Sequence, residues 1–176
     1  MNQVLTAIEK RSSTRGYTEQ KLTKEELDSL LKAGLQAPTA TNRQEIHITV
    51  VDGENPILAE IEKEKNVKRD IQNPPHNFYY EAPTVLLLSA EKEFSWSKVD
   101  AGIAVENISL AAEALGLGSL IIGCIKEALC DEKKEYFANE LKFREGYEFE
   151  IAIAVGHKAV SKEPHDYSFE KNVTYL

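Results

Sequence analysis

The sequence lacks any apolar run long enough to span a bilayer, and it has no excess of positive charge. The longest apolar stretches, around 85–88 and 115–122, fall well short of the ~20 residues that a transmembrane helix needs. The net charge of −8 argues against nucleic acid or an anionic membrane as the main partner, because both bind a basic face. The N-terminal residues lack the basic-then-apolar order of a secretory signal, so we expect a cytoplasmic protein.

Side chains that build metal sites or acid–base catalysts are equally sparse. Cys124 and Cys130 lie six residues apart with no histidine nearby, so we expect neither a disulfide framework nor a metal site and interpret both as buried or inert thiols. The histidines are scattered singly, and the spacing gives no Ser-His-Asp set or carboxylate pair. We therefore assign no catalytic residue and expect a cofactor to supply any chemistry.

Length, composition and periodicity predict one α/β or α+β domain over 1–176. Capping signals and helical spacing predict a helix at 3–10, a helix that begins at the capping box of 23–26 and is stopped by Ala37-Pro38, and a helix from Pro56 behind Asn55. Residues 66–80 are expected to be irregular. Alternation predicts that Phe149, Ile151, Ile153 and Val155 share one strand face. The strands are expected at 46–51, 85–89, 120–124 and 148–155.

The segment from Ser97 to Leu115 is apolar or small on nearly every side of the expected helix. Such a helix must be buried almost all round, which is hard in a chain of this size, so we expect part of it to pack against a second subunit. Gly116 and Gly118 follow this helix and precede a strand, the reverse of the order in a dinucleotide-binding loop. We interpret both as helix-ending glycines.

Two polar clusters are candidates for ligand binding. Residues 10–15, Lys-Arg-Ser-Ser-Thr-Arg, gather the guanidinium and hydroxyl donors that a phosphate requires, although a solvated helix end would look the same. Residues 37–44, Ala-Pro-Thr-Ala-Thr-Asn-Arg-Gln, carry carboxamides that suit the edge of a heterocycle, or they form an ordinary connecting loop. Each cluster keeps both interpretations when taken alone.

Taken in order along the chain, these motifs resemble the nitroreductase family. Residues 11–17 are similar to its Arg-x-Ser-x-Arg-x-aromatic segment, and residues 37–44 to its Ala-Pro-Ser-x-x-Asn-x-Gln loop. Residues 81–85 are similar to its Gly-Ala-Pro-x-x strand entry, and residues 100–123 resemble its central helix and the strand that follows. The matches run from residue 11 to about 156.

The resemblance implies a three-layer sandwich with a mixed central sheet flanked by helices, and a homodimer with FMN at the subunit interface. It implies that NADH or NADPH gives a hydride to the flavin, which passes it in a ping-pong sequence to a small acceptor such as a nitroaromatic or quinone. The phosphate would be held by Arg11, Ser12, Ser13 and Arg15. The ring would lie near Ile121, Ile122 and Gly123, and near Pro38, Thr39, Ala40, Asn42 and Gln44 of the partner chain or of the same pocket floor.

The sequence departs from the family pattern at three places. Glu45-Ile46-His47 stands where the family often has Pro-Trp-His, and only 92–98 is available for the helical lid of longer members, which implies a compact, open site. The family's C-terminal basic pair has no clear match, and the candidates are Lys158, Lys162 and His165. A flavin-binding or redox-sensing module without turnover, or an anion-binding protein without flavin, remains an alternative.

Two further residue groups keep open interpretations at this point. Arg43 could stabilise negative charge on the reduced flavin ring, or its side chain could simply face solvent. The polar tail at 161–176 must dock on something to be ordered.

Overall fold

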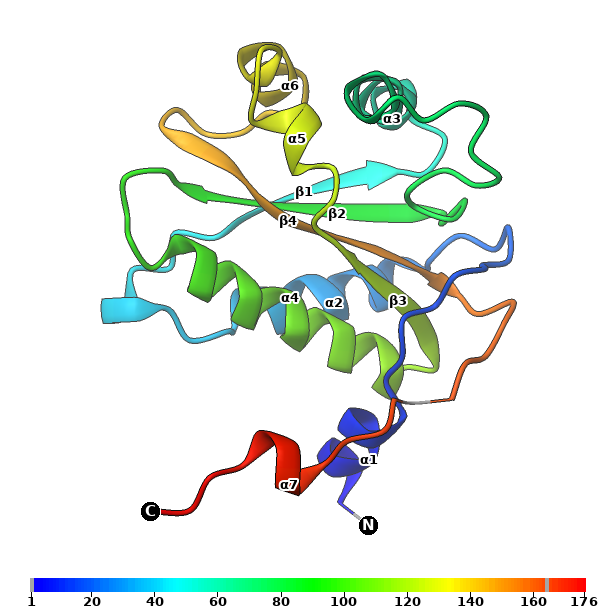
Figure 1. Cartoon of the computed structure of the whole chain (residues 1–176), viewed down its shortest axis with the longest axis vertical. Helices are drawn as coiled ribbons and strands as arrows, with labels where there is room; N and C mark the ends of the chain where they lie inside the picture. The colour runs from blue at the N-terminus through cyan, green and yellow to red at the C-terminus, as the bar shows by residue number, and fades with distance from the viewer. Residues whose placement is uncertain (1, 164) are drawn as a thin grey trace.

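The computed structural model describes residues 2–163 and 165–176, and it has the three layers that were expected. A central sheet separates two helical layers (Figure 1). The strands are β1 (His47–Asp52), β2 (Thr84–Glu91), β3 (Leu117–Ile122) and β4 (Tyr147–His157), in the order β1-β2-β4-β3. All three strand pairs are antiparallel, and the parallel component of the expected mixed sheet is an isolated bridge between Ser13 and Ser119.

The prediction that Phe149 shares one face of β4 with Ile151, Ile153 and Val155 is wrong, because the register shifts between Leu88 and Ser89 of β2. Leu88 pairs with Ile151 whereas Ser89 pairs with Phe149, so Glu150 is the extra residue of a β-bulge. Because one extra residue reverses the alternation, Phe149 packs in the core on the opposite face of the sheet from Ile153.

The two faces of the sheet are covered by different helices. One core lies under α3 (Pro56–Arg69), α5 (Lys126–Leu129) and α6 (Lys134–Glu140), and the other lies under α2 (Lys24–Leu35) and α4 (Ser97–Ala114). The predicted helix starts are confirmed, since Thr23 and Glu26 form the capping box and Asn55 caps α3.

Three sequence interpretations need correction. α3 continues to Arg69, so 66–69 is helical, and the pairing of Lys65 and Arg69 with Glu127 of α5 stabilises that last turn. Gly116 ends α4 with a φ of +78°, but Gly118 lies inside β3, which begins three residues earlier than predicted. Cys124 is exposed, which excludes the first of the two alternatives, buried or inert, for that thiol.

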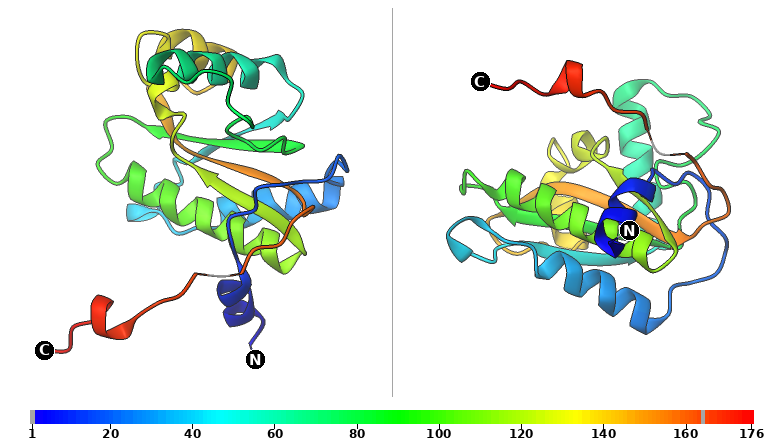
Figure 2. Two further views of the ribbon diagram at one scale, coloured as in Figure 1. Left: turned by 45° about the vertical axis from the view of Figure 1, so that its right-hand side comes forward. Right: turned by 90° about the horizontal axis from the view of Figure 1, so that it is seen from below.

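Apolar side chains remain exposed on α4 and on the segments that lie outside the sandwich. α1 (Gln3–Lys10) lies beyond α4, and the C-terminal segment with α7 (Phe169–Asn172) extends away from the layers (Figures 1 and 2). Val4, Leu5 and Ile8 of α1 are 62%, 58% and 52% exposed, and Val99 and Ile103 of α4 are 49% and 37% exposed. Within the described residues we find no helix that combines the length and the apolar character needed to cross a membrane.

Candidate functional site

The segment that carries the basic cluster is fixed to the edge of the sheet by backbone hydrogen bonds. The Thr14 N–H donates to the Ser119 carbonyl at 2.9 Å, and the Thr18 N–H donates to the His157 carbonyl at 3.0 Å. Gly118 permits this approach, because a Cβ at that position would lie 2.7 Å from the Thr14 side chain. Burial raises the pKa of Tyr17, whose hydroxyl therefore stays protonated and donates to the Thr14 carbonyl at 3.1 Å.

This extended segment presents alternate side chains to two different hollows. Ser12 and Thr14 line a hollow of about 200 Å³, together with Lys158 and Lys162. Arg15 lines a second hollow of about 370 Å³ beside the end of β3. The structure therefore divides the predicted phosphate cluster, as expected from the two-residue period of an extended chain.

The second hollow brings Arg15 together with the predicted strand-end residues. Its lining includes Ile121, Ile122, Gly123 and the exposed Cys124. The sequence interpretation missed its remaining wall, which is built from the loop preceding β2. That wall consists of Pro75, His76, Asn77, Phe78 and Tyr80.

The Arg15 guanidinium lies 5.9 Å from the centre of the Tyr80 ring, which in turn stacks on His76. An aromatic triplet within an otherwise polar stretch, Phe78-Tyr79-Tyr80, is the signal that could have identified this wall. Asn77 shapes the loop locally, because its side-chain oxygen accepts hydrogen bonds from the Tyr79 and Glu81 N–H groups.

The predicted ring-binding loop adopts a backbone that non-glycine residues rarely take. Thr41, Asn42 and Gln44 have φ values of +56°, +54° and +53°. Such residues are uncommon in this region, and a β-branched threonine there is an outlier. Strain of this kind gathers at binding and catalytic sites.

Two side-chain contacts hold this loop in place. The Gln44 N–H donates to Thr39 Oγ1 at 2.8 Å, and the Ala40 N–H donates to Asp100 Oδ2 in the first turn of α4 at 2.9 Å. Arg43 does not point freely into solvent, because its Nε donates to Glu91 Oε2 at 2.8 Å and its guanidinium lies 4.7 Å from the centre of the Phe94 ring.

The two predicted clusters lie at opposite ends of α4 within one chain (Figure 1). Ala40 contacts Asp100 near the start of the helix, whereas Lys158, beside Ser12, binds Glu113 near its end at 2.6 Å. Thirteen residues of α-helix separate these two contacts, which is about 20 Å. The same chain therefore does not bring the loop at 38–44 to the hollow that Ser12 and Lys158 line.

The structure distinguishes the three C-terminal basic candidates. Lys158 and Lys162 line the Ser12 hollow, and the backbone of Lys158 pairs with Tyr17. His165 is exposed in the tail that leaves the sandwich. Arg11 turns toward α4, where its Nε lies 3.8 Å from Glu106 Oε1.

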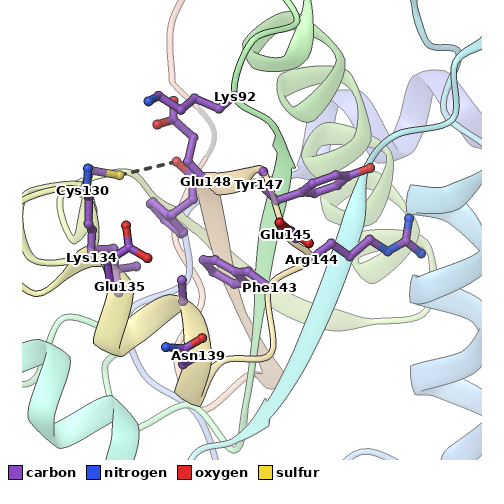
Figure 3. Close-up of a pocket in the computed structure, with 14 residues that line it drawn as sticks. Lys92, Cys130, Lys134, Glu135, Asn139, Phe143, Arg144, Glu145, Tyr147 and Glu148 are labelled. Carbon is purple, nitrogen blue, oxygen red and sulfur yellow. Dashed lines mark hydrogen bonds between the residues drawn. The ribbon is translucent and has the colours of Figure 1, made fainter.

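Another hollow, of about 630 Å³, lies at the start of β4 (Figure 3). Its rim carries charges of both signs, from Lys92, Lys134 and Arg144 and from Glu135, Glu145 and Glu148. Cys130 lies at its edge with its thiol 3.7 Å from the Phe149 carbonyl oxygen. Over the described part of the chain, no group of three or more His, Cys, Asp or Glu side chains is placed to hold a metal ion.

Arg15, the end of β3 and an aromatic wall line one hollow, a combination better suited to holding an organic cofactor than to side-chain catalysis. The family model described as "Nitroreductase family" matches residues 8–157 of the 176. The chain belongs to the nitroreductase family.

Individual relatives agree with this assignment. The chain is similar to a nitroreductase with bound FMN from Desulfitobacterium hafniense DCB-2, with 27% identity, a TM-score of 0.89, and coverage of 100% of this chain and 99% of that one. An FMN-dependent nitroreductase from Clostridium difficile R20291 is 28% identical, with a TM-score of 0.85 and 99% of each chain covered. A protein of Bacillus subtilis (strain 168) named FMN reductase (NADPH) is 30% identical over 149 residues, which are 73% of this chain and 57% of that protein. The chain thus spans little more than half the length of that relative.

Proposed function

We propose that this protein is an FMN-dependent oxidoreductase that uses NADH or NADPH. The observation that carries the proposal is the hollow in which Arg15 faces Ile121, Ile122 and Gly123, in a chain similar over its whole length to a nitroreductase described with bound FMN. Relatives named FMN reductase support the same activity. Bound FMN would accept a hydride from the nicotinamide and pass it, in a ping-pong sequence, to a small acceptor such as a nitroaromatic or quinone.

The residues of the site fit a flavin mononucleotide. Arg15 is an exposed cation at the hollow's edge and would donate to the phosphate. Arg11, Ser12 and Ser13 precede it on the same segment but do not line this hollow, so they would turn toward the phosphate to donate to it. Lys158 already pairs with Glu113, so its charge is partly compensated, and its contribution to the phosphate would be smaller. Gly123 is exposed at the strand end and leaves room for the ring to approach the backbone.

We propose that the active form is a homodimer in which Pro38, Thr39, Ala40, Asn42 and Gln44 reach the flavin of the partner subunit. The separation of the loop from the Ser12 hollow supports this arrangement, because the two lie near opposite ends of α4 in one chain. The exposed apolar side chains of α1 and α4 provide a surface of the kind that subunits bury. A cytoplasmic location remains a prediction.

Three measurements on the purified chain test the proposed activity. We expect a yellow protein whose acid-released flavin chromatographs as FMN. Anaerobic NADH or NADPH should bleach the flavin absorbance, and a quinone or nitroaromatic added afterwards should restore it. Stoichiometric flavin with negligible NAD(P)H oxidation would instead identify a binding or sensing module. A colourless protein that takes up no FMN would overturn the proposal.

A further inference from the structure

The conformation of the 39–44 loop depends on contacts with residues outside it, and two buried carboxyl groups, Glu45 and Asp100, adjoin the loop. Three residues of the loop have positive φ, so its conformation persists only if surrounding contacts determine it. Asp100, 2% exposed, supplies one such contact by accepting the Ala40 N–H at 2.9 Å. Glu45 follows the loop directly and is only 3% exposed.

Glu45 has the features of an acid that keeps its proton. Among the described residues, neither of its carboxyl oxygens has a hydrogen-bond partner that donates to it. An ionised carboxylate in that position would lose its hydration without compensation, and a second carboxylate nearby would add repulsion. A neutral Glu45 avoids both costs and gains a proton that it can donate.

We propose that Glu45 is a positioning residue whose proton is shared with Asp100 in the folded protein, and that this pair holds the 39–44 loop in the shape that binds flavin. The role in flavin binding rests on the proposed function. In this arrangement Glu45 donates its proton to Asp100 Oδ1, while Asp100 Oδ2 accepts the Ala40 N–H. One proton is held between two carboxyl groups, and no group outside the pair gains or loses charge.

The surrounding charges agree with this assignment. Burial above all, and then the neighbouring Asp100 carboxyl, raise the pKa of Glu45, while its own backbone N–H and the cation of Arg43 oppose the shift. Arg43 is itself paired with Glu91 at the end of β2, so part of its charge is already neutralised. Because the folded-state pKa is raised, the stability contributed by the neutral acid is fully present below the ordinary glutamate pKa and is lost as the pH rises through the raised value.

The first test measures thermal unfolding of wild type and Glu45→Gln without flavin. Glutamine keeps the shape and the hydrogen-bond donor but cannot ionise. We expect the two melting temperatures to lie close together at acid pH and the variant to become the more stable protein as the pH rises through the raised pKa of Glu45. The matched control is Glu25→Gln, which removes an exposed acid at the start of α2 and should leave the wild-type pH dependence in place. Parallel curves for wild type and Glu45→Gln would overturn the shared proton.

The second test titrates FMN into the same proteins and into Glu45→Ala. We expect Glu45→Gln to bind like wild type at acid pH and more tightly than wild type once Glu45 is ionised, and Glu45→Ala to bind about tenfold more weakly than wild type at acid pH. The phosphate of FMN also changes its charge with pH, but this affects all the proteins alike. Affinities are therefore compared between proteins at the same pH. Wild type that binds no FMN would defeat the proposed function, whereas normal FMN binding with equal affinities in all variants would defeat the positioning role alone.

Discussion

The sharpest prediction concerns the arginines of the basic segment, since it separates a phosphate site from a solvated helix end. Arg11 now faces Glu106 at 3.8 Å, and the Glu106 side chain is 46% exposed. An exposed pair of that kind contributes only about 0–1 kcal/mol, so phosphate can compete for the guanidinium. Arg15 lies over Tyr80, and an exposed contact of this type is worth about 0.5–1 kcal/mol.

A charge-assisted hydrogen bond to phosphate is worth about 1.5–3 kcal/mol, which exceeds either existing contact. Arg11→Ala and Arg15→Ala should therefore each weaken FMN binding roughly tenfold to a hundredfold. Lysine at either position should cost less than alanine, because it keeps the charge but loses the planar fork. Lys158→Ala should have a smaller effect than either arginine change, because Lys158 is already bound to Glu113.

Fluorescence titration of apoprotein with FMN and with riboflavin measures these affinities. Riboflavin lacks the phosphate, so wild type and the arginine variants should bind it almost equally. A variant that merely unfolded the segment would weaken both ligands together, and Lys32→Ala on the exposed side of α2 controls for loss of a cation elsewhere. FMN affinities within about twofold of wild type for both alanine variants would show that the cluster is only a charged helix end.

Three further outcomes follow from other parts of the molecule. Gly118→Val should lower the melting temperature and weaken FMN binding, because its side chain would collide with Thr14; unchanged thermal unfolding would contradict this close approach. Hydrogen bonds from Arg69 and Lys65 lower the pKa of Glu127 to about 2, so its contribution to stability is present above the ordinary glutamate pKa and is lost as the pH falls toward that value. The free energy of unfolding of Glu127→Gln should therefore fall less steeply with decreasing pH than that of wild type. Light scattering should give twice the 19.7 kDa chain mass, and a stable monomer would refute the shared site.

Local signals in the sequence predicted the elements whose causes are themselves local. The capping box at Thr23 and the Asn55-Pro56 pair act within one helical turn, and both helices begin where these residues predict. The end of α3 was misjudged because the residue that stabilises it, Glu127, lies about sixty positions further along the chain. The residues around 66–69 in the sequence do not include Glu127, so they do not predict where the helix ends.

The placement of Phe149 failed for a related reason. The alternation from Phe149 to Val155 is regular in the sequence, but the bulge at Glu150 depends on how β4 pairs with β2. The motifs of the site were likewise recognisable one by one, whereas their positions at opposite ends of α4 follow only from the packed structure. The aromatic wall at 75–80 was not predicted, because it lies in a stretch without regular secondary structure. It nevertheless carries Tyr80, the ring over which Arg15 lies.

The two halves of the candidate site are held by different kinds of contact, and this difference determines how each half responds to substitution. Backbone hydrogen bonds fix the Arg15 segment to Ser119 and His157, so its outward side chains can change without altering the path of the chain. Side chains hold the 39–44 loop, through Thr39 and Asp100, so a change at either contact alters the path itself. Substitutions of outward side chains in the Arg15 segment should therefore change mainly the affinity for an anion. Those in the second half should change how the loop is presented, because its positive-φ residues relax once their restraints are removed.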